Sequence, residues 1–194
     1  MELNKKFFLA LVLIIVGVAS RFIFLIDGVS AVPNFSAVGA IALLGATYFK
    51  GVSKWMIPIA LLWISDLVLN NVVYAEYYDS FQFIGSTWVY GAFLLTGIVA
   101  YFIMRKASWF RLGVAGLTAS IIFFVVTNFG VWMTSGMYTL DTSGLVTCFT
   151  LAIPFFINTL LGNLFYSFLL FGIYEFTAAR NKKIQPVLGD TMIA

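Results

Sequence analysis

The chain lacks the residues on which many enzymes depend. Histidine is absent from its 194 residues, and Cys148 is the single cysteine. The absence of histidine removes the usual general base, the commonest metal ligand and any Ser-His or Cys-His nucleophile. One cysteine cannot form a disulfide or a redox pair within the chain. These absences favour a function other than catalysis or metal binding.

Several sequence motifs are missing as well. No GxxxxGK[ST] sequence occurs that would cradle the phosphates of ATP, and neither HExxH nor CxxC is present. Paired carboxylates inside a hydrophobic segment are also absent, since Asp66 is the one acid that lies well within such a segment. We therefore expect no enzymatic activity, no cofactor, and no ATP hydrolysis by this chain itself.

Charge is scarce, while apolar residues are abundant. Charged residues make up 10% of the chain and hydrophobic ones 62%, with a mean hydropathy of +1.01, whereas soluble domains carry about 25% charged residues. Several apolar runs approach the roughly 20 residues that a helix needs to cross a bilayer. The sequence predicts an all-α polytopic membrane protein, a single membrane domain over residues 1–194. Its six transmembrane helices are expected at about 7–26, 36–50, 54–72, 87–104, 110–134 and 146–175.

The basic residues predict the orientation of these helices. With both termini in the cytoplasm, ten of the 11 Lys and Arg residues fall on the cytoplasmic side, as the positive-inside rule requires. The exception is Arg21. The acids Asp27, Glu76, Asp79 and Asp141 then fall on the outer side. The positive charge thus indicates topology, and we do not expect a nucleic-acid partner.

Asp66 stands out because it lies in the apolar stretch "ALLWISDLVLNN". At about 1.5 Å per helical residue, it lies roughly 18 Å along the third span from Lys54, beyond the midplane. Arg21 lies roughly 22 Å beyond Lys6, in the same layer. A charge at a helix centre costs about 2.5–3.5 kcal/mol on insertion scales, so Asp66 should face the bundle and pair with Arg21. Two interpretations are open: a structural pair, or part of an outward-facing binding pocket.

Other polar side chains share the outer half of the predicted bundle. Asparagine amides could bridge helices or orient the amides and hydroxyls of a ligand. Tyrosines and phenylalanines between residues 74 and 83 fit either an interfacial aromatic belt or a lid over a flat ligand. The predicted substrate-binding set is Arg21, Asn34, Asp66, Asn70, Tyr90, Asn128, Trp132 and Asn158.

The second predicted span is short and rich in small residues. Small residues spaced three and four apart let another helix backbone approach closely. This span has Ala37, Gly39, Ala40, Ala42, Gly45 and Ala46. The span could be tilted, re-entrant or buried among the others. Its small-residue face could pack within this chain or against a membrane partner.

A set of motifs in order along the chain resembles an uncharacterised bacterial family of multi-pass membrane proteins labelled as transport proteins. These motifs are "PNFSAVGAIALLGATYF", "ISDLVLN", "VYGAFLL", "FFVVTNFGVW" and "IPFFINTLLGNLFYSFLLFG". The family is in turn similar to the substrate-binding S components of energy-coupling-factor transporters. The resemblance implies six helices in the bacterial cytoplasmic membrane and capture of a vitamin or related micronutrient from outside. It also implies, as partners, a separate transmembrane coupling subunit and ATPases.

Three functions remain open at this stage. The first is a solute-capturing membrane subunit, with the lipid bilayer and a small-molecule substrate as partners, which works alone or with an energising complex. The alternative is a structural or assembly subunit of a larger membrane complex. A third is an autonomous proton-coupled carrier that uses Asp66.

Overall fold

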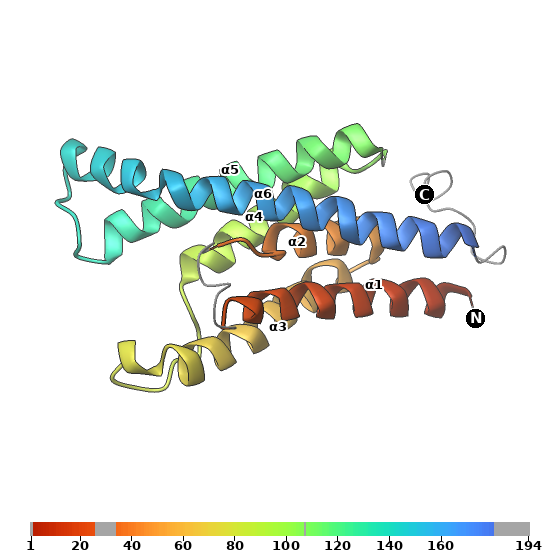
Figure 1. Ribbon diagram of the computed structural model, residues 1–194, viewed down its shortest axis with the longest axis horizontal. Coiled ribbons are helices and arrows are strands. Elements are labelled where there is room, and N and C mark those ends of the chain that lie inside the picture. The colour runs from red at the N-terminus through yellow and green to blue at the C-terminus, as the bar shows by residue number, and fades with distance from the viewer. Residues whose placement is uncertain (1, 26–33, 107, 181–194) are drawn as a thin grey trace.

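The computed structural model describes residues 2–25, 34–106 and 108–180, and these ranges contain helices and no strand. The predicted all-α class is therefore confirmed. Figure 1 shows the helices lying side by side along a common long axis. In chain order the elements are α1 (Glu2–Ala19), the 3-10 helix η1 (Ser20–Leu25), α2 (Val38–Tyr48), α3 (Ser53–Val68), the π-helix η2 (Leu69–Val73), the 3-10 helix η3 (Ala75–Tyr77), α4 (Thr87–Ile103), α5 (Trp109–Thr134) and α6 (Thr142–Arg180).

Three helical segments are long and apolar enough to cross a membrane. They are Ser53–Val73, Trp109–Thr134 and Thr142–Thr177, with mean hydropathies of 1.7, 2.0 and 1.9. Three further apolar helices, Phe7–Phe22, Val38–Tyr48 and Thr87–Ile103, are shorter. Length and composition thus indicate a membrane protein. The count of six spans stays a prediction.

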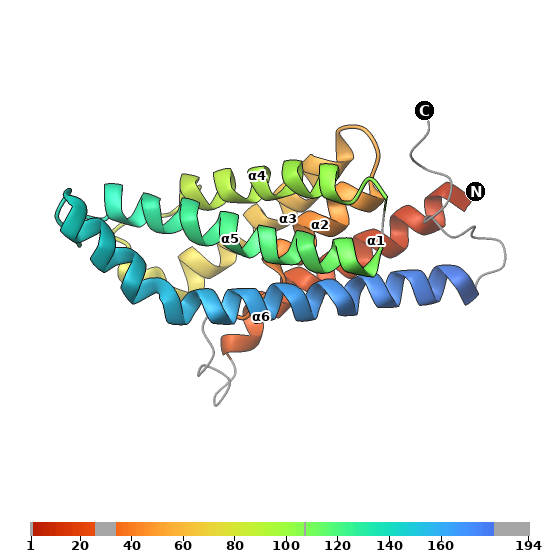
Figure 2. The same ribbon diagram turned by 90° about the horizontal axis from the view of Figure 1, so that it is seen from above.

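The helix bounds differ from the predicted ones mainly at the first and last helices. The first span becomes a 3-10 helix at Ser20, so Arg21 lies just past the end of α1. The last helix begins at Thr142 because Asp141 caps it, accepting a hydrogen bond from the Gly144 N–H at 2.7 Å. Pro154 lies inside α6, and Figure 2 shows this helix bent in its first third, as expected where a proline removes a backbone hydrogen bond.

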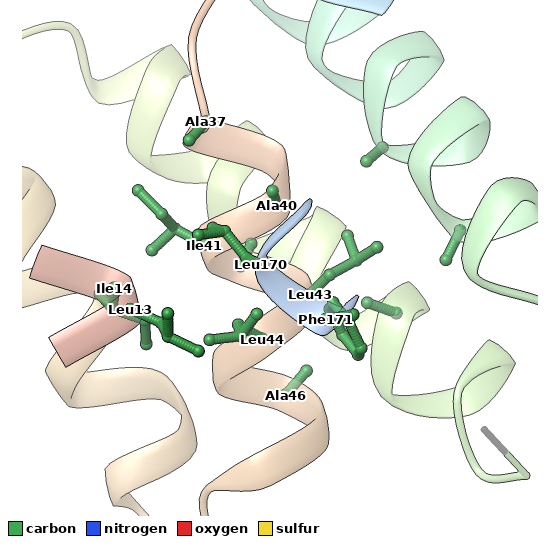
Figure 3. Close-up of a cluster of buried hydrophobic side chains, with 14 of the residues drawn as sticks. Leu13, Ile14, Ala37, Ala40, Ile41, Leu43, Leu44, Ala46, Leu170 and Phe171 are labelled. Carbon is green, nitrogen blue, oxygen red and sulfur yellow. The ribbon is translucent and has the colours of Figure 1, made fainter. Parts of the chain in front are cut away.

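Helix α2 is the core of the bundle. Residues 39–46 are all buried, and α2 contacts each of the other five α-helices. Figure 3 shows its side chains between those of α1 (Leu13 and Ile14) and α6 (Leu170 and Phe171). A side-chain carbon on Gly45 would lie 2.4 Å from the Pro58 ring of α3, so glycine permits this close approach. The short second span is therefore buried among the others, and its small residues pack within the chain.

The first turn of α2 is capped by side chains from other helices. Its own N-cap residue, Ala37, offers no side-chain acceptor. Instead the Ala37 N–H donates to Ser20 Oγ at 3.2 Å, and the Gly39 N–H donates to Asn163 Oδ1 at 3.0 Å. A buried N–H without an acceptor is costly. Ser20 and Asn163 thus fix the position of α2 between the first and last helices.

The two ends of the bundle carry opposite charge. Figure 1 places the start of α1, the α2–α3 turn, the α4–α5 turn and the end of α6 at one end. The basic residues at that end include Lys50, Lys54, Arg105, Lys106 and Arg111. The opposite end, with the α3–α4 and α5–α6 connections, carries Glu76, Asp79 and Asp141. We call these the basic end and the acidic end.

Candidate functional site

An ion pair between Arg21 and Asp66 lies toward the acidic end. Arg21 Nη1 is 2.6 Å from Asp66 Oδ1, and the two side chains are 17% and 9% exposed. The same nitrogen donates to the hydroxyl of Ser65 and, at 3.4 Å, to the Leu62 carbonyl. The structure therefore brings together the two charges that sequence depth placed in one layer. η1 supplies the cation and the last two turns of α3 supply the acceptors.

Tyr90 completes the coordination of the carboxylate. Its hydroxyl, in the first turn of α4, donates to Asp66 Oδ2 at 2.7 Å. Both oxygens of Asp66 thus have a charged or polar partner, as a buried carboxylate requires. Three segments that are distant in sequence meet at this one group. The Arg21 cation balances the carboxylate, so the cluster carries no net charge.

The backbone of Gly85 and the amide of Asn70 adjoin the carboxylate. A side-chain carbon on Gly85 would lie 3.2 Å from both Asn70 Nδ2 and Asp66 Oδ2. Asn70 lies on η2, where the Tyr74 N–H donates to the Leu69 carbonyl at 2.8 Å in the wide π-helical pattern. Such π-bulges are frequent at functional sites. Asn70 is therefore a predicted amide that the structure places close to the ion pair.

Residues 82–85, which we call the strap, are bound to the C-terminal part of α3 and to η2. The Asn71 side chain accepts from the Gln82 N–H at 2.7 Å and donates to the Gln82 carbonyl at 2.9 Å. The Trp63 indole N–H donates to the Phe83 carbonyl at 2.9 Å. Earlier in the same loop, Tyr77 and Phe81 are largely exposed. This exposure fits both an interfacial aromatic belt and a lid over a ligand. The strap holds Gly85 against the ion pair.

Asn128 and Trp132 form hydrogen bonds away from this cluster. The Asn128 amide donates to the Phe124 carbonyl of its own helix at 2.8 Å, and the Trp132 indole N–H donates to the Thr139 carbonyl at 2.9 Å. Asn34 is exposed, with a positive φ of 66° just before α2. Asn158 is half-buried on α6. The structure joins Arg21, Asp66, Asn70 and Tyr90, and it does not join Asn128 or Trp132 to them. Asp27 lies outside the described residues.

Sequence reasoning missed four members of the site: Trp63, Ser65, Asn71 and Gly85. Ser65 and Asn71 adjoin predicted residues in sequence, and this adjacency was the available signal. Trp63 and Gly85 act through the backbone geometry of the strap, which sequence spacing does not indicate.

A second polar cluster, fully buried, joins α2, α5 and α6. Besides accepting from Gly39, the Asn163 amide donates to Ser120 Oγ at 2.9 Å. The Ser120 hydroxyl donates to the Gly116 carbonyl at 2.9 Å. Asn163 and Ser120 are 3% and 0% exposed. This cluster is uncharged, and both bonds of Asn163 run between helices, so its chemistry is that of helix association.

No arrangement suited to a metal ion occurs in the described ranges. Residues 2–25, 34–106 and 108–180 contain no group of three or more His, Cys, Asp or Glu side chains that could hold one.

A protein family model, described as a family of unknown function (DUF6580), matches residues 1–187. No curated protein and no solved structure matches the chain.

Proposed function

We propose, on the premise that the chain belongs to the DUF6580 family of unknown function, that it is a membrane-embedded solute-binding protein. It captures a small organic micronutrient from the outer side of the bacterial cytoplasmic membrane. It does so as the S component of an energy-coupling-factor-type importer or as a solitary relative of such components. The six-helix reading and the motif resemblance support this proposal.

The observation that carries the proposal is the Arg21–Asp66–Tyr90 cluster under the strap. A buried ion pair is weak evidence for stability, because well-packed apolar residues in its place often stabilise a protein equally well. Ionisable groups at membrane depth more commonly mark a substrate or ion pathway. Here the pair lies toward one end of the bundle, beside an amide and beneath a loop held by a few hydrogen bonds. This is the arrangement expected of a site that opens when the loop moves.

The proposed membrane topology has six spans with both termini cytoplasmic. The 17 residues of α4 extend about 26 Å, close to the 30 Å of a hydrocarbon core. The basic end then faces the cytoplasm and the acidic end faces outward. Reporter fusions after Ser80 and after Asp141 should therefore lie outside the cell. A cytoplasmic signal from either fusion would contradict the topology and the outward-facing site.

If uptake is driven by ATP, the energy must come from other subunits. The chain has no phosphate-binding glycine loop, so ATP-driven transport requires a separate transmembrane coupling subunit and ATPases. The purified chain reconstituted in liposomes should neither hydrolyse ATP nor accumulate solute with ATP alone.

A structural or assembly role is the second candidate, and one observation favours it. Both oxygens of Asp66 are already satisfied by Arg21 and Tyr90. The pair could therefore serve helix association alone. In that case the protein would co-purify with a large membrane complex and without a small molecule.

One experiment separates the two candidates. Protein purified gently in mild detergent is denatured, and the released small molecules are identified by mass spectrometry. The binding proposal expects a stoichiometric organic molecule that is lost from Asp66→Asn and retained by the exposed control Asp79→Asn. An empty wild-type protein, together with full uptake by a folded Arg21→Gln/Asp66→Asn double variant, would remove the binding role.

A further inference from the structure

A narrow recess lies at the basic end, away from the proposed solute site. Its walls come from the end of α2, the α4–α5 turn and the last part of α6, which Figure 1 places at the same end of the bundle. Its interior of about 30 Å³ has room for one or two water-sized groups. The lining includes Tyr48, Met104, Ser108, Trp109, Phe171 and Glu175.

The recess contains a carboxylate without a cation. Glu175 Oε1 accepts a hydrogen bond from the Tyr48 hydroxyl at 2.8 Å. Among the side chains that the structure describes, the recorded ion pair is Arg21–Asp66, so none of those Lys or Arg side chains pairs with Glu175. A half-buried carboxylate at membrane depth calls for a positive partner. Its remaining oxygen is available to a ligand.

Aromatic rings of Tyr48, Trp109 and Phe171 line the same recess as this carboxylate. The Tyr48 ring stacks on Tyr174, with centroids 3.7 Å apart and planes 25° apart, and lies 5.1 Å from the Phe171 ring. Aromatic faces attract cations electrostatically, and more strongly where water is excluded. A carboxylate and aromatic rings together favour a compact organic cation over an anion or an apolar group.

The rim of the recess has the opposite charge. Met104 and Ser108 line the recess, and the exposed Arg105 and Lys106 lie between them in the chain. Arg111, in the first turn of α5, donates to the Ile103 carbonyl at 3.0 Å and so stays beside this turn. A negative interior beneath a positive rim matches a zwitterionic ligand. Its cationic group would enter the recess, and its anionic group would stay at the rim.

We propose that the recess binds the headgroup of a zwitterionic phospholipid that carries a primary ammonium group. The ammonium group donates to Glu175, and the phosphate lies against the basic α4–α5 turn, as basic pockets at this membrane face hold lipid phosphates. The acyl chains lie along the exposed Trp109 and Phe168, whose rings stack with centroids 6.0 Å apart. The small interior selects a primary ammonium over a bulkier trimethylammonium.

The test uses the full chain in mild detergent with equal amounts of phosphatidylethanolamine, phosphatidylcholine and phosphatidylglycerol, read by native mass spectrometry. The wild type should retain phosphatidylethanolamine in preference to the other two. Loss of one charge-assisted hydrogen bond corresponds to about a tenfold loss of affinity, so Glu175→Gln should lower phosphatidylethanolamine retention by about that factor. Glu76→Gln, which removes a carboxylate at the acidic end, should retain it as the wild type does.

A double variant at the rim of the recess tests whether the effect is merely structural. Arg105→Gln/Lys106→Gln should lower retention of phosphatidylethanolamine while leaving thermal stability unchanged, because both side chains are exposed. Equal retention of the three lipids by the wild type, or unchanged retention by Glu175→Gln, would overturn the proposal. So would a preference for phosphatidylcholine, or displacement of the lipid by free ethanolamine at equal concentration, which would make the ligand a free amine.

Discussion

Two polar clusters join helices of the bundle, one through charged side chains and the other through neutral ones. At the acidic end, Arg21 and Asp66 are oppositely charged, lie close to a loop, and have side chains that are 17% and 9% exposed. In the middle, Asn163 and Ser120 are neutral, almost fully buried and bonded to the backbone of α2 and α5. The neutral cluster costs less to bury and is sufficient to join three helices. The charged cluster is therefore more than helix association requires.

The largest expected effect on stability comes from removing one partner of the Arg21–Asp66 ion pair. Asp66→Ala and Arg21→Ala should each lower the free energy of unfolding by about 3–5 kcal/mol, because each leaves a buried charge unpaired. The double variant should recover part of that loss. Unfolding in mixed detergent, monitored by circular dichroism, measures all three. Additive losses in this double-mutant cycle would contradict the pairing, and Asp79→Asn provides the matched exposed control.

Breaking the neutral cluster should have a smaller but still large effect. Asn163→Leu removes the acceptor of the Gly39 N–H, and a buried group left unsatisfied costs about 1–3 kcal/mol. Asn163→Asp keeps an acceptor oxygen near the positive end of the α2 dipole, so it should destabilise the protein less. The same unfolding assay applies, and solute binding by folded Asn163→Leu should persist. Loss of binding without loss of stability would show that the two clusters do not have separate roles.

Releasing the strap should alter dynamics more than stability. Asn71→Ala removes both side-chain hydrogen bonds to Gln82, a loss of about 1–2 kcal/mol at roughly 1 kcal/mol each. We expect faster amide hydrogen exchange confined to residues 74–86 and a faster solute off-rate. The exposed control Glu76→Gln changes a neighbouring side chain without touching the strap. Unchanged exchange in Asn71→Ala would mean that Trp63 alone holds the strap.

The smallest expected effect is electrostatic and lies at the start of α6. Hydrogen bonds from the Gly144 N–H and the Thr139 hydroxyl lower the pKa of Asp141 below its ordinary value of 3.8. A lowered folded-state pKa means that the ionised form stabilises the fold above the unfolded pKa. This contribution is lost as the pH falls through the lower folded pKa. The melting-temperature difference between wild type and Asp141→Asn should therefore be present at neutral pH and vanish at acidic pH, whereas a pH-independent difference would contradict it.

The parts of the architecture that depend on local pattern could be predicted from the sequence. Apolar runs and boundary residues placed all six helices, and depth along the spans placed Arg21 beside Asp66. The bonding of Asn163 to Gly39 could not be predicted, because the two residues are 124 positions apart in sequence and an amide on an apolar helix has many potential partners. The grouping of Asn128 and Trp132 with Asp66 used depth alone. Depth does not specify which way a side chain points around a helix.

The first N–H groups of α2 are capped by Ser20 and Asn163, which lie in other elements, and this has a consequence for the order of folding during synthesis. An 11-residue helix extends about 16 Å, roughly half of a hydrocarbon core, and one acceptor for its first N–H groups is synthesised only with α6. Before α6 is present, the Gly39 N–H lacks this acceptor, and an unsatisfied donor in lipid costs several kcal/mol. We therefore expect α2 to reach its final place only after α6 is inserted. A chain truncated before α6 is expected to stay open to chaperones and membrane proteases.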